Sequence, residues 1–167
     1  MDAKFVIDTN VGRLARWLRM MGYDAILFHE LDDGLMVKLA LAQGRVIVTK
    51  DSEFMKRRAV TSRRVRAVLV AGDDSEAQMQ RVIGELKLNT RYKPFTRCLE
   101  CNTLLQSRDR EGVEGEVPPR VYAKQDQYME CPACHRLFWQ GTHWEDMCRK
   151  LEQFELHRPP VAEGDKP

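Results

Sequence analysis

Short apolar segments alternate with helix-like patterns over the first half of the chain, and this alternation most limits its possible folds. Strands are expected at residues 4–8, 24–28, 45–51 and 65–74, and helices at 10–22, 32–44, 52–60 and 75–86. Strands that alternate with helices over short connections favour a parallel sheet with helices on both faces. We therefore predict an α/β domain. Its last helix begins with Ser75-x-x-Gln78, the pattern of a capping box.

Acidic residues recur where the expected strands end. Each strand is followed by one or two carboxylates, at Asp8, at Asp32 and Asp33, at Asp51, and at Asp73 and Asp74. In a parallel sheet these positions meet at the carboxyl edge, where open α/β folds bind ligands. The sequence therefore predicts a cluster of carboxylates at one edge of the sheet.

Helix capping explains any single one of these acids, because Asp is a preferred N-cap and each of them precedes a helix. Their recurrence at all four strand ends favours a functional cluster. Crowded carboxylates repel one another unless a cation lies between them, and oxygen ligands favour Mg²⁺ or Mn²⁺. Such a metal lowers the pKa of a bound water and stabilises charge on a phosphate. Lys50 and Arg13 are then candidates to hold a phosphate backbone.

Two other folds with an acidic edge fit the sequence less well. A receiver domain needs an acidic pair after its first strand, whereas Asp8 is followed by Thr9 and Asn10. A haloacid-dehalogenase phosphatase needs Asp-x-Asp, and Asn10 occupies the position of the second acid. Both alternatives are weakened, and the sequence alone eliminates neither.

Two CxxC pairs dominate the chain beyond residue 90. Their spacing predicts a tetrahedral, structural Zn²⁺ site in a zinc ribbon, with the ligands Cys98, Cys101, Cys131 and Cys134. Between the pairs, the segment 111–122 (EGVEGEVPPRVY) suggests a hairpin with proline at its edge. Cys148 lies outside the pattern and is expected to be a buried thiol.

Aromatic and basic residues follow the second CxxC pair. Phe138, Trp139 and Trp144 are expected mainly to pack the ribbon against the main domain, although such rings also stack on unpaired bases. His143 is either a contact to phosphate or substrate or a helix cap. Further basic clusters lie at residues 13–19 and 56–66, although the net charge of the whole chain is only +2.

Neither a signal peptide nor a run of transmembrane length is recognisable in the sequence. Five cysteines in such a chain fit metal binding in the cytoplasm better than a disulfide framework. We expect a main domain at residues 1–90, the ribbon at 91–155 and a disordered tail at 156–167.

Several segments together resemble the Mut7-C RNase domain family, a branch of the PIN-like nucleases with an appended zinc ribbon. The resemblance runs from Lys4 to Leu151 and rests on FVIDTNVGRLARWLRMMGYDA, DDGLMVKLA, RVIVTKD, the two CxxC pairs and FWQGTHWEDM. It implies a PIN-like three-layer α/β/α fold and metal-dependent RNase activity.

The family's acids match positions of this chain. They correspond to Asp8, to Asp33 (with Asp32 as a substitute), to Asp51, and to Asp73 or Asp74. A Gly-Ser-His-Trp segment of the family corresponds to residues 141–144, with Thr142 replacing the serine.

The resulting hypothesis is a cytoplasmic ribonuclease that acts on single-stranded or structured RNA. Asp8, Asp33 and Asp51 would bind Mg²⁺ or Mn²⁺, and Asp73 would complete the catalytic set. Arg13, Arg16, Lys50 and His143 would contact the substrate. The rival hypothesis is a non-catalytic RNA- or protein-binding module, and a phosphatase for small phosphoesters is a lesser one. A protein partner is left open.

Overall fold

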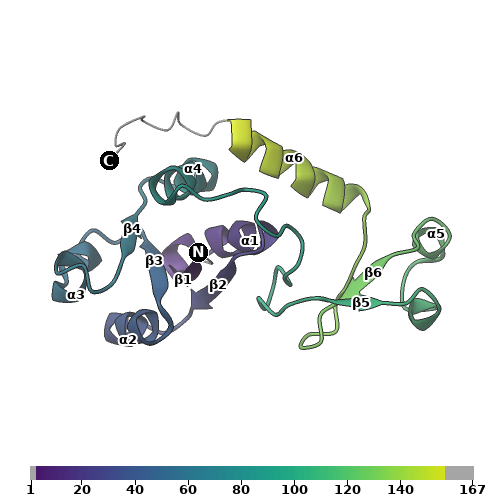
Figure 1. Cartoon of the computed structure of the whole chain (residues 1–167), viewed down its shortest axis with the longest axis horizontal. Coiled ribbons are helices and arrows are strands. Elements are labelled where there is room, and N and C mark those ends of the chain that lie inside the picture. Colours follow the sequence, from purple (N-terminus) through teal and green to yellow (C-terminus); the bar gives the residue numbers. More distant parts are fainter. Residues whose placement is uncertain (1–2, 157–167) are drawn as a thin grey trace, which may run out of the picture.

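The computed structural model describes residues 3–156, and its helices and strands are labelled in Figure 1. The first part of the chain contains β1 (Lys4–Asp8), η1 (Thr9–Val11), α1 (Arg13–Met20), β2 (Asp24–Phe28), α2 (Asp33–Gln43), β3 (Arg45–Thr49), η2 (Phe54–Lys56), α3 (Arg58–Thr61), β4 (Ala67–Leu69) and α4 (Ser75–Leu86). The second part contains β5 (Gln106–Arg108), η3 (Glu111–Val113), α5 (Pro119–Tyr122), β6 (Tyr128–Glu130), β7 (Leu137–Phe138) and α6 (Thr142–Leu156).

The first four strands form a parallel sheet in the order β2-β1-β3-β4, which confirms the predicted α/β class. Side chains alternate between its two faces. Phe5 and Ile7 of β1 join the core beneath α1 and α4, whereas Val6 joins a separate core beneath α2 and α3. Helices therefore cover both faces, as the alternation of strands and helices predicted.

Strand β4 is shorter than predicted and ends at Leu69. Among the described residues it is an edge strand that pairs only with β3, and its ladder ends level with Thr49. Gly72 then turns the chain with φ +73°, which leaves Asp73 and Asp74 in the loop before α4. The expected helix at residues 52–60 is likewise two short elements, η2 and α3.

The predicted capping box at the start of α4 was wrong, because Ser75 and Gln78 do not cap the helix. Asp74 is the N-cap, and its carboxylate accepts a hydrogen bond from the backbone N–H of Glu76 at 2.9 Å. Ser75 is already the first helical residue. The Gln78 side chain donates to the carbonyl of Gly72 at 2.7 Å instead of reaching back to a cap.

The second part of the chain is built on the antiparallel sheet β5-β6-β7. The hairpin expected at residues 111–122 is wrong, because this segment forms η3 and α5 between β5 and β6. Pro119 opens α5, where the fixed φ of proline suits the first helical turn. Val113, Val117 and Tyr128 bury their side chains together in a small core of their own.

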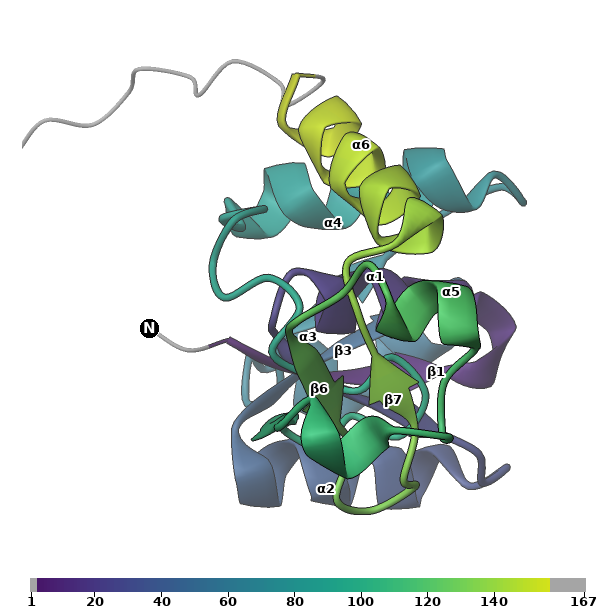
Figure 2. The same ribbon diagram turned by 90° about the vertical axis from the view of Figure 1, so that its right-hand side faces the viewer.

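Helix α6 returns from the second part of the chain to the first, where both views place it beside α4 (Figures 1 and 2). Its Leu151 and Phe154 are buried in the core beneath α1 and α4. The rings of Trp17 and Phe154 lie 5.0 Å apart, and Lys150 pairs with Glu76. The end of the chain thus contributes to the core of its beginning.

No helix within residues 3–156 is long and apolar enough to cross a membrane. The expected disordered tail lies beyond residue 156, outside the described residues.

Candidate functional site

The carboxylate of Asp8 is held at the carboxyl end of β1 by two side chains. Its Oδ2 accepts hydrogen bonds from the Thr49 hydroxyl and the Asn10 amide, each at 2.7 Å. Asn10 also accepts from the backbone N–H of Lys50 at 3.3 Å. The loop after β1 and the end of β3 are thereby fixed to each other around one acid.

Asp51 is connected to Asp8 through Thr49. The Thr49 hydroxyl donates to Asp8 and accepts from the backbone N–H of Asp51 at 3.0 Å. Oδ1 of Asp51 accepts from the backbone N–H of Glu53 at 2.8 Å. Thr49 is fully buried, whereas Asp8 and Asp51 are both half-buried. The two acids therefore sit on a rigid support with part of each carboxylate open to solvent.

The two remaining pairs of neighbouring acids divide into caps and ion pairs. Asp32 and Asp74 cap α2 and α4 through hydrogen bonds to backbone N–H groups at 2.7 and 2.9 Å. Asp33 instead pairs with Arg57 at 2.8 Å, and Asp73 pairs with Lys50 at 3.2 Å. Capping therefore accounts for one acid of each pair and leaves the other directed at a cation.

The acids are not gathered into a common set of metal ligands. Within residues 3–156, the potential ligand atoms that all lie within 4.8 Å of one another belong to Cys98, Cys101, Cys131 and Cys134. The carboxylates at the carboxyl edge of the sheet (the acidic edge: Asp8, Asp33, Asp51 and Asp73) form no such group in this part of the chain. Asp33 and Asp73 would have to leave Arg57 and Lys50 to join Asp8 and Asp51 at one cation.

The residues predicted to contact substrate lie in two places. Lys50 is at the acidic edge, and Arg13 is exposed at the start of α1. Arg16, one turn further along α1, pairs with Glu100 of the ribbon at 3.0 Å. His143 is exposed in the first turn of α6.

The four predicted zinc ligands do come together. The Sγ atoms of Cys101 and Cys131 lie 3.3 Å apart, and those of Cys98 and Cys134 lie 3.6 Å apart. Four sulfurs at about 2.3 Å from a tetrahedral Zn²⁺ would lie roughly 3.8 Å from one another. The cluster is therefore close to the size of a structural zinc site.

The two CxxC segments have the same backbone shape. The residue after each second cysteine, Asn102 or His135, adopts a positive φ of 70° or 58° and donates its N–H to the carbonyl of the first cysteine. These turns point both thiols of each segment at one point. Such a repeated turn supports a metal cluster over a redox pair.

The thiols differ in acidity. Burial raises the pKa of Cys98 to about 12. Burial also acts to raise the pKa of Cys101, but hydrogen bonds with Thr103 and the neighbouring thiols lower it to about 6. A bound zinc ion would favour the thiolate at every position. Cys148 was expected to be buried, but it is only half-buried and lies outside the cluster.

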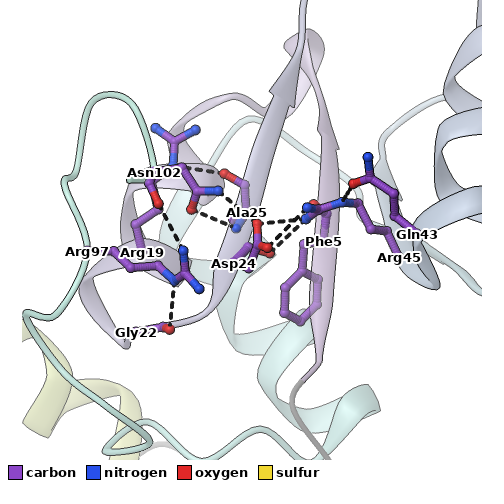
Figure 3. A network of polar contacts seen from close by, with 9 residues as sticks. All are labelled: Phe5, Arg19, Gly22, Asp24, Ala25, Gln43, Arg45, Arg97 and Asn102. Atoms are coloured by element: carbon purple, nitrogen blue, oxygen red, sulfur yellow. Dashed lines mark hydrogen bonds and ion pairs between the residues drawn. The ribbon is translucent and has the colours of Figure 1, made fainter. Parts of the chain in front are cut away.

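The first CxxC segment is attached to the edge of the parallel sheet by polar contacts (Figure 3). Asn102 accepts from the N–H of Ala25 at 3.0 Å and donates to Asp24 at 2.8 Å. The buried Arg19 donates to the carbonyls of Leu99 and Glu100 at 2.9 and 2.8 Å. The edge strand β2 is thus covered by the ribbon, a role that sequence reasoning missed for Arg19 and Asn102.

A groove of about 1090 Å³ is lined by residues between Pro94 and Met147 and by Arg16 of α1. Arg16 and His143 both line it. Two of the residues predicted to contact substrate therefore meet here, although they are more than a hundred positions apart in the chain. The ring of Trp144 lies 5.5 Å from that of Phe95, and Trp139 packs against the small core of Val113, Val117 and Tyr128. Both contacts lie within residues 91–155, the predicted ribbon, rather than between the ribbon and the main domain.

The sequence model of the Mut7-C RNAse domain matches residues 3–151. The chain belongs to the Mut7-C RNAse domain family. The match includes the acidic edge, both CxxC segments and most of α6, so it supports a nuclease-type function that acts on RNA. Comparisons with curated proteins and with solved structures gave no significant match.

Proposed function

We propose that this protein is a ribonuclease that hydrolyses phosphodiester bonds with Mg²⁺ or Mn²⁺ at the acidic edge of a PIN-like α/β/α domain. The observation that carries the proposal is the connection between Asp8 and Asp51 through Thr49. It places two partly exposed carboxylates at the carboxyl edge of a parallel sheet, where such folds bind ligands. Membership in a family of RNase domains supports RNA as the substrate.

The donor set suits a hard cation. Oδ2 of Asp8 is engaged by Thr49 and Asn10, whereas among residues 3–156 its Oδ1 receives only contacts of 3.4 Å from Thr9 and from the N–H of Asn10. One oxygen of Asp8, together with Asp51 and Asp33, would hold the cation. When bound, the metal would supply an activated water and charge stabilisation at the phosphate.

Other residues of the chain would position the substrate. Lys50 and Arg57 each pair with an acid of the edge, and an RNA phosphate offers each of them an alternative partner. Their release would free Asp73 and Asp33 for the metal or its water. Thr49 and Asn10 would keep the Asp8 carboxylate oriented through their hydrogen bonds.

The four cysteines would hold a structural Zn²⁺, because a closed set of four thiolates leaves no position open for substrate. We also propose a main domain at 1–90 and a ribbon at 91–155, with α6 as the segment that fastens them together. A cytoplasmic location fits the free thiols.

A cleavage assay on labelled single-stranded RNA with added Mn²⁺ tests the proposal. Wild type should cleave, and Asp8→Asn should reduce the rate on the order of 10²-fold or more, because a charge that stabilises the reaction is lost. Asp74→Asn is the matched control, since Asn caps a helix as well as Asp does and should preserve activity. Replacement of Mn²⁺ by Ca²⁺ should stop turnover while leaving the zinc in place.

Equal cleavage by wild type and Asp8→Asn would remove the acidic edge from the reaction. RNA binding without any cleavage would favour the rival binding module. Hydrolysis of a chromogenic phosphate ester without action on RNA would favour a phosphatase.

A further inference from the structure

The groove lined by Arg16 and by residues between Pro94 and Met147 is larger than a typical small-molecule site. Its volume of about 1090 Å³ exceeds the roughly 300–1,000 Å³ that suit drug-sized ligands. Segments from α1, from residues 94–105, from the ribbon and from the start of α6 all line it. Its size therefore leaves room for a ligand larger than a drug-sized molecule.

Charge in the groove is strongly one-sided. One acid lines it, Glu100, against the cations Arg16, Arg97, Arg120, Lys124 and Arg136. Glu100 is shared by Arg16 at 3.0 Å and Arg136 at 3.5 Å. Within residues 3–156, the exposed side chains of Arg120 and Lys124 have no hydrogen-bond or ion-pair partner. The groove thus presents cations that are free to bind an anionic chain.

Aromatic rings line the same groove as these cations. Phe138 and Trp139 come from the end of the ribbon, and Trp144 comes from the first turn of α6. All three are half-buried, so each packs on one side and leaves part of its ring in the groove. Rings beside cations bind single-stranded nucleic acid by stacking on bases while the cations contact phosphates.

The groove reaches α1 at Arg16. Arg16 and His143 line both the groove and a smaller cavity of about 220 Å³ between α1 and α6. Arg13 precedes Arg16 by three positions, which places both on neighbouring turns of one helix face. Arg13 lies at the end of α1 that follows Asp8. Arg16 and Arg13 are therefore two exposed cations of α1, one lining the groove and the other at the helix start that follows Asp8.

We propose that this groove binds an unpaired segment of RNA, with bases on the aromatic residues and phosphates on Arg120 and Lys124, and leads the strand along α1 to Asp8. The inference rests on the proposed ribonuclease function for its substrate. An acidic protein segment is the other occupant that the charge allows. The exposed ring surface favours RNA, because stacking needs the face of an unpaired base.

The test is fluorescence anisotropy with a labelled oligouridine and Ca²⁺ in place of Mn²⁺. The double variant Arg120→Glu/Lys124→Glu should weaken binding at least tenfold near physiological salt. It should also flatten the dependence of log Kd on log salt by about 0.7 for each lost phosphate contact. The matched control is Arg63→Glu/Arg64→Glu, which makes the same change in charge at exposed residues outside the groove and should stay within about twofold of wild type.

A second variant separates stacking from charge. Trp139→Leu should weaken binding of oligouridine, and Trp139→Phe should restore most of it, because a ring is again present. A fully paired duplex should bind more weakly than the single strand. Zinc content and circular dichroism identify any variant that fails to fold. If a tryptophan variant fails to fold, the charge variants alone test the inference.

Equal loss of binding in the groove and control variants would overturn the inference, as would no loss in either. Competition by an oligoglutamate peptide as strong as that by unlabelled oligouridine would also overturn it and point to a protein partner. Cleavage by wild type is measured in parallel with Mn²⁺. Groove-dependent binding without cleavage refutes the proposed function alone, whereas cleavage with normal binding by the groove variants refutes the groove alone.

Discussion

Arg45 and Asp24 form a two-point ion pair at the amino end of the parallel sheet. Nη1 of Arg45 lies 2.8 Å from Oδ1 of Asp24, and Nη2 lies 3.1 Å from Oδ2 (Figure 3). The pair joins the starts of β3 and β2 across β1, whose Phe5 carbonyl accepts from the same guanidinium at 3.0 Å. At this end of the sheet the charged side chains of Arg45 and Asp24 are paired with each other. At the other end the carboxylates of Asp8 and Asp51 are partly exposed to solvent.

The first prediction concerns acid stability. Burial acts to raise the pKa of Asp24, but hydrogen bonds from Arg45 and Asn102 outweigh it and hold the pKa below its ordinary value. The folded state therefore binds a proton at Asp24 more weakly than the unfolded state, whose pKa is about 3.9. The resulting stabilisation is present above pH of about 4 and is lost as the pH falls through the lower, folded pKa.

Urea unfolding between neutral pH and pH of about 3 measures this effect. Asp24→Asn should show a smaller loss of stability on acidification than wild type. Asp109→Asn is the control, because this exposed side chain has no hydrogen-bond or ion-pair partner within residues 3–156. If the free energy of unfolding falls equally with pH in wild type and in Asp24→Asn, Asp24 is not the source of the loss of stability in acid.

The second prediction concerns metal content. Purified protein should hold one zinc ion per chain, and Cys98→Ser should lose it, because the four thiols form a single cluster. Cys148→Ser should retain it, since this thiol lies outside the cluster. Elemental analysis with a thermal unfolding curve measures both. Zinc retained in full by Cys98→Ser would contradict the four-cysteine site.

The third prediction separates two roles of Asn102. Its positive φ of 70° suits glycine, while its side chain bonds to Ala25 and Asp24. Asn102→Gly keeps the backbone relaxed and loses only the hydrogen bonds, at a cost of about 1–3 kcal/mol. Asn102→Ala adds about 1 kcal/mol of strain in the left-handed region.

Free energies of unfolding in urea for wild type, Asn102→Gly and Asn102→Ala measure the loss of the hydrogen bonds and the added backbone strain. Equal stability of the glycine and alanine variants would show that the backbone relaxes elsewhere. Equal stability of the glycine variant and wild type would show that the covered edge of β2 does not depend on Asn102.

How far the sequence predicted these features depends on the range of the interactions. The bounds of β1 and β2 match the expected segments, because local periodicity and turn residues define them. The four cysteines were predicted as ligands because metal coordination imposes a fixed spacing. The hairpin predicted at residues 111–122 was wrong, because the glycines and prolines of this segment permit helical turns as readily as a hairpin. Burial of Val113 and Val117 decides between the two conformations.

Long-range roles were harder to predict. No local pattern shows that Arg19 reaches the carbonyls of Leu99 and Glu100, eighty positions away. The choice between neighbouring acids also depended on three-dimensional structure, since Arg57 lies beside Asp33 only after folding. The asparagine that follows the first CxxC pair was a usable signal, because asparagine tolerates a positive φ better than most residues.

The fourth prediction concerns Thr49, which supports the proposed reaction without binding the substrate. Thr49→Val keeps the shape of a fully buried side chain but removes the hydroxyl that bonds to Asp8 and to the N–H of Asp51. Loss of such a supporting contact at a metal ligand typically costs about 10–100-fold in activity or metal affinity. Thr49→Ser retains the hydroxyl and should recover most of both.

RNA cleavage as a function of Mn²⁺ concentration distinguishes positioning from a general loss of structure. Thr49→Val should shift the Mn²⁺ dependence to higher concentration while zinc content stays at the wild-type level, because the cysteines lie in the ribbon. Loss of zinc together with activity would indicate unfolding. Unchanged Mn²⁺ dependence and unchanged cleavage in the valine variant would mean that the bond between Thr49 and Asp8 has no part in the reaction.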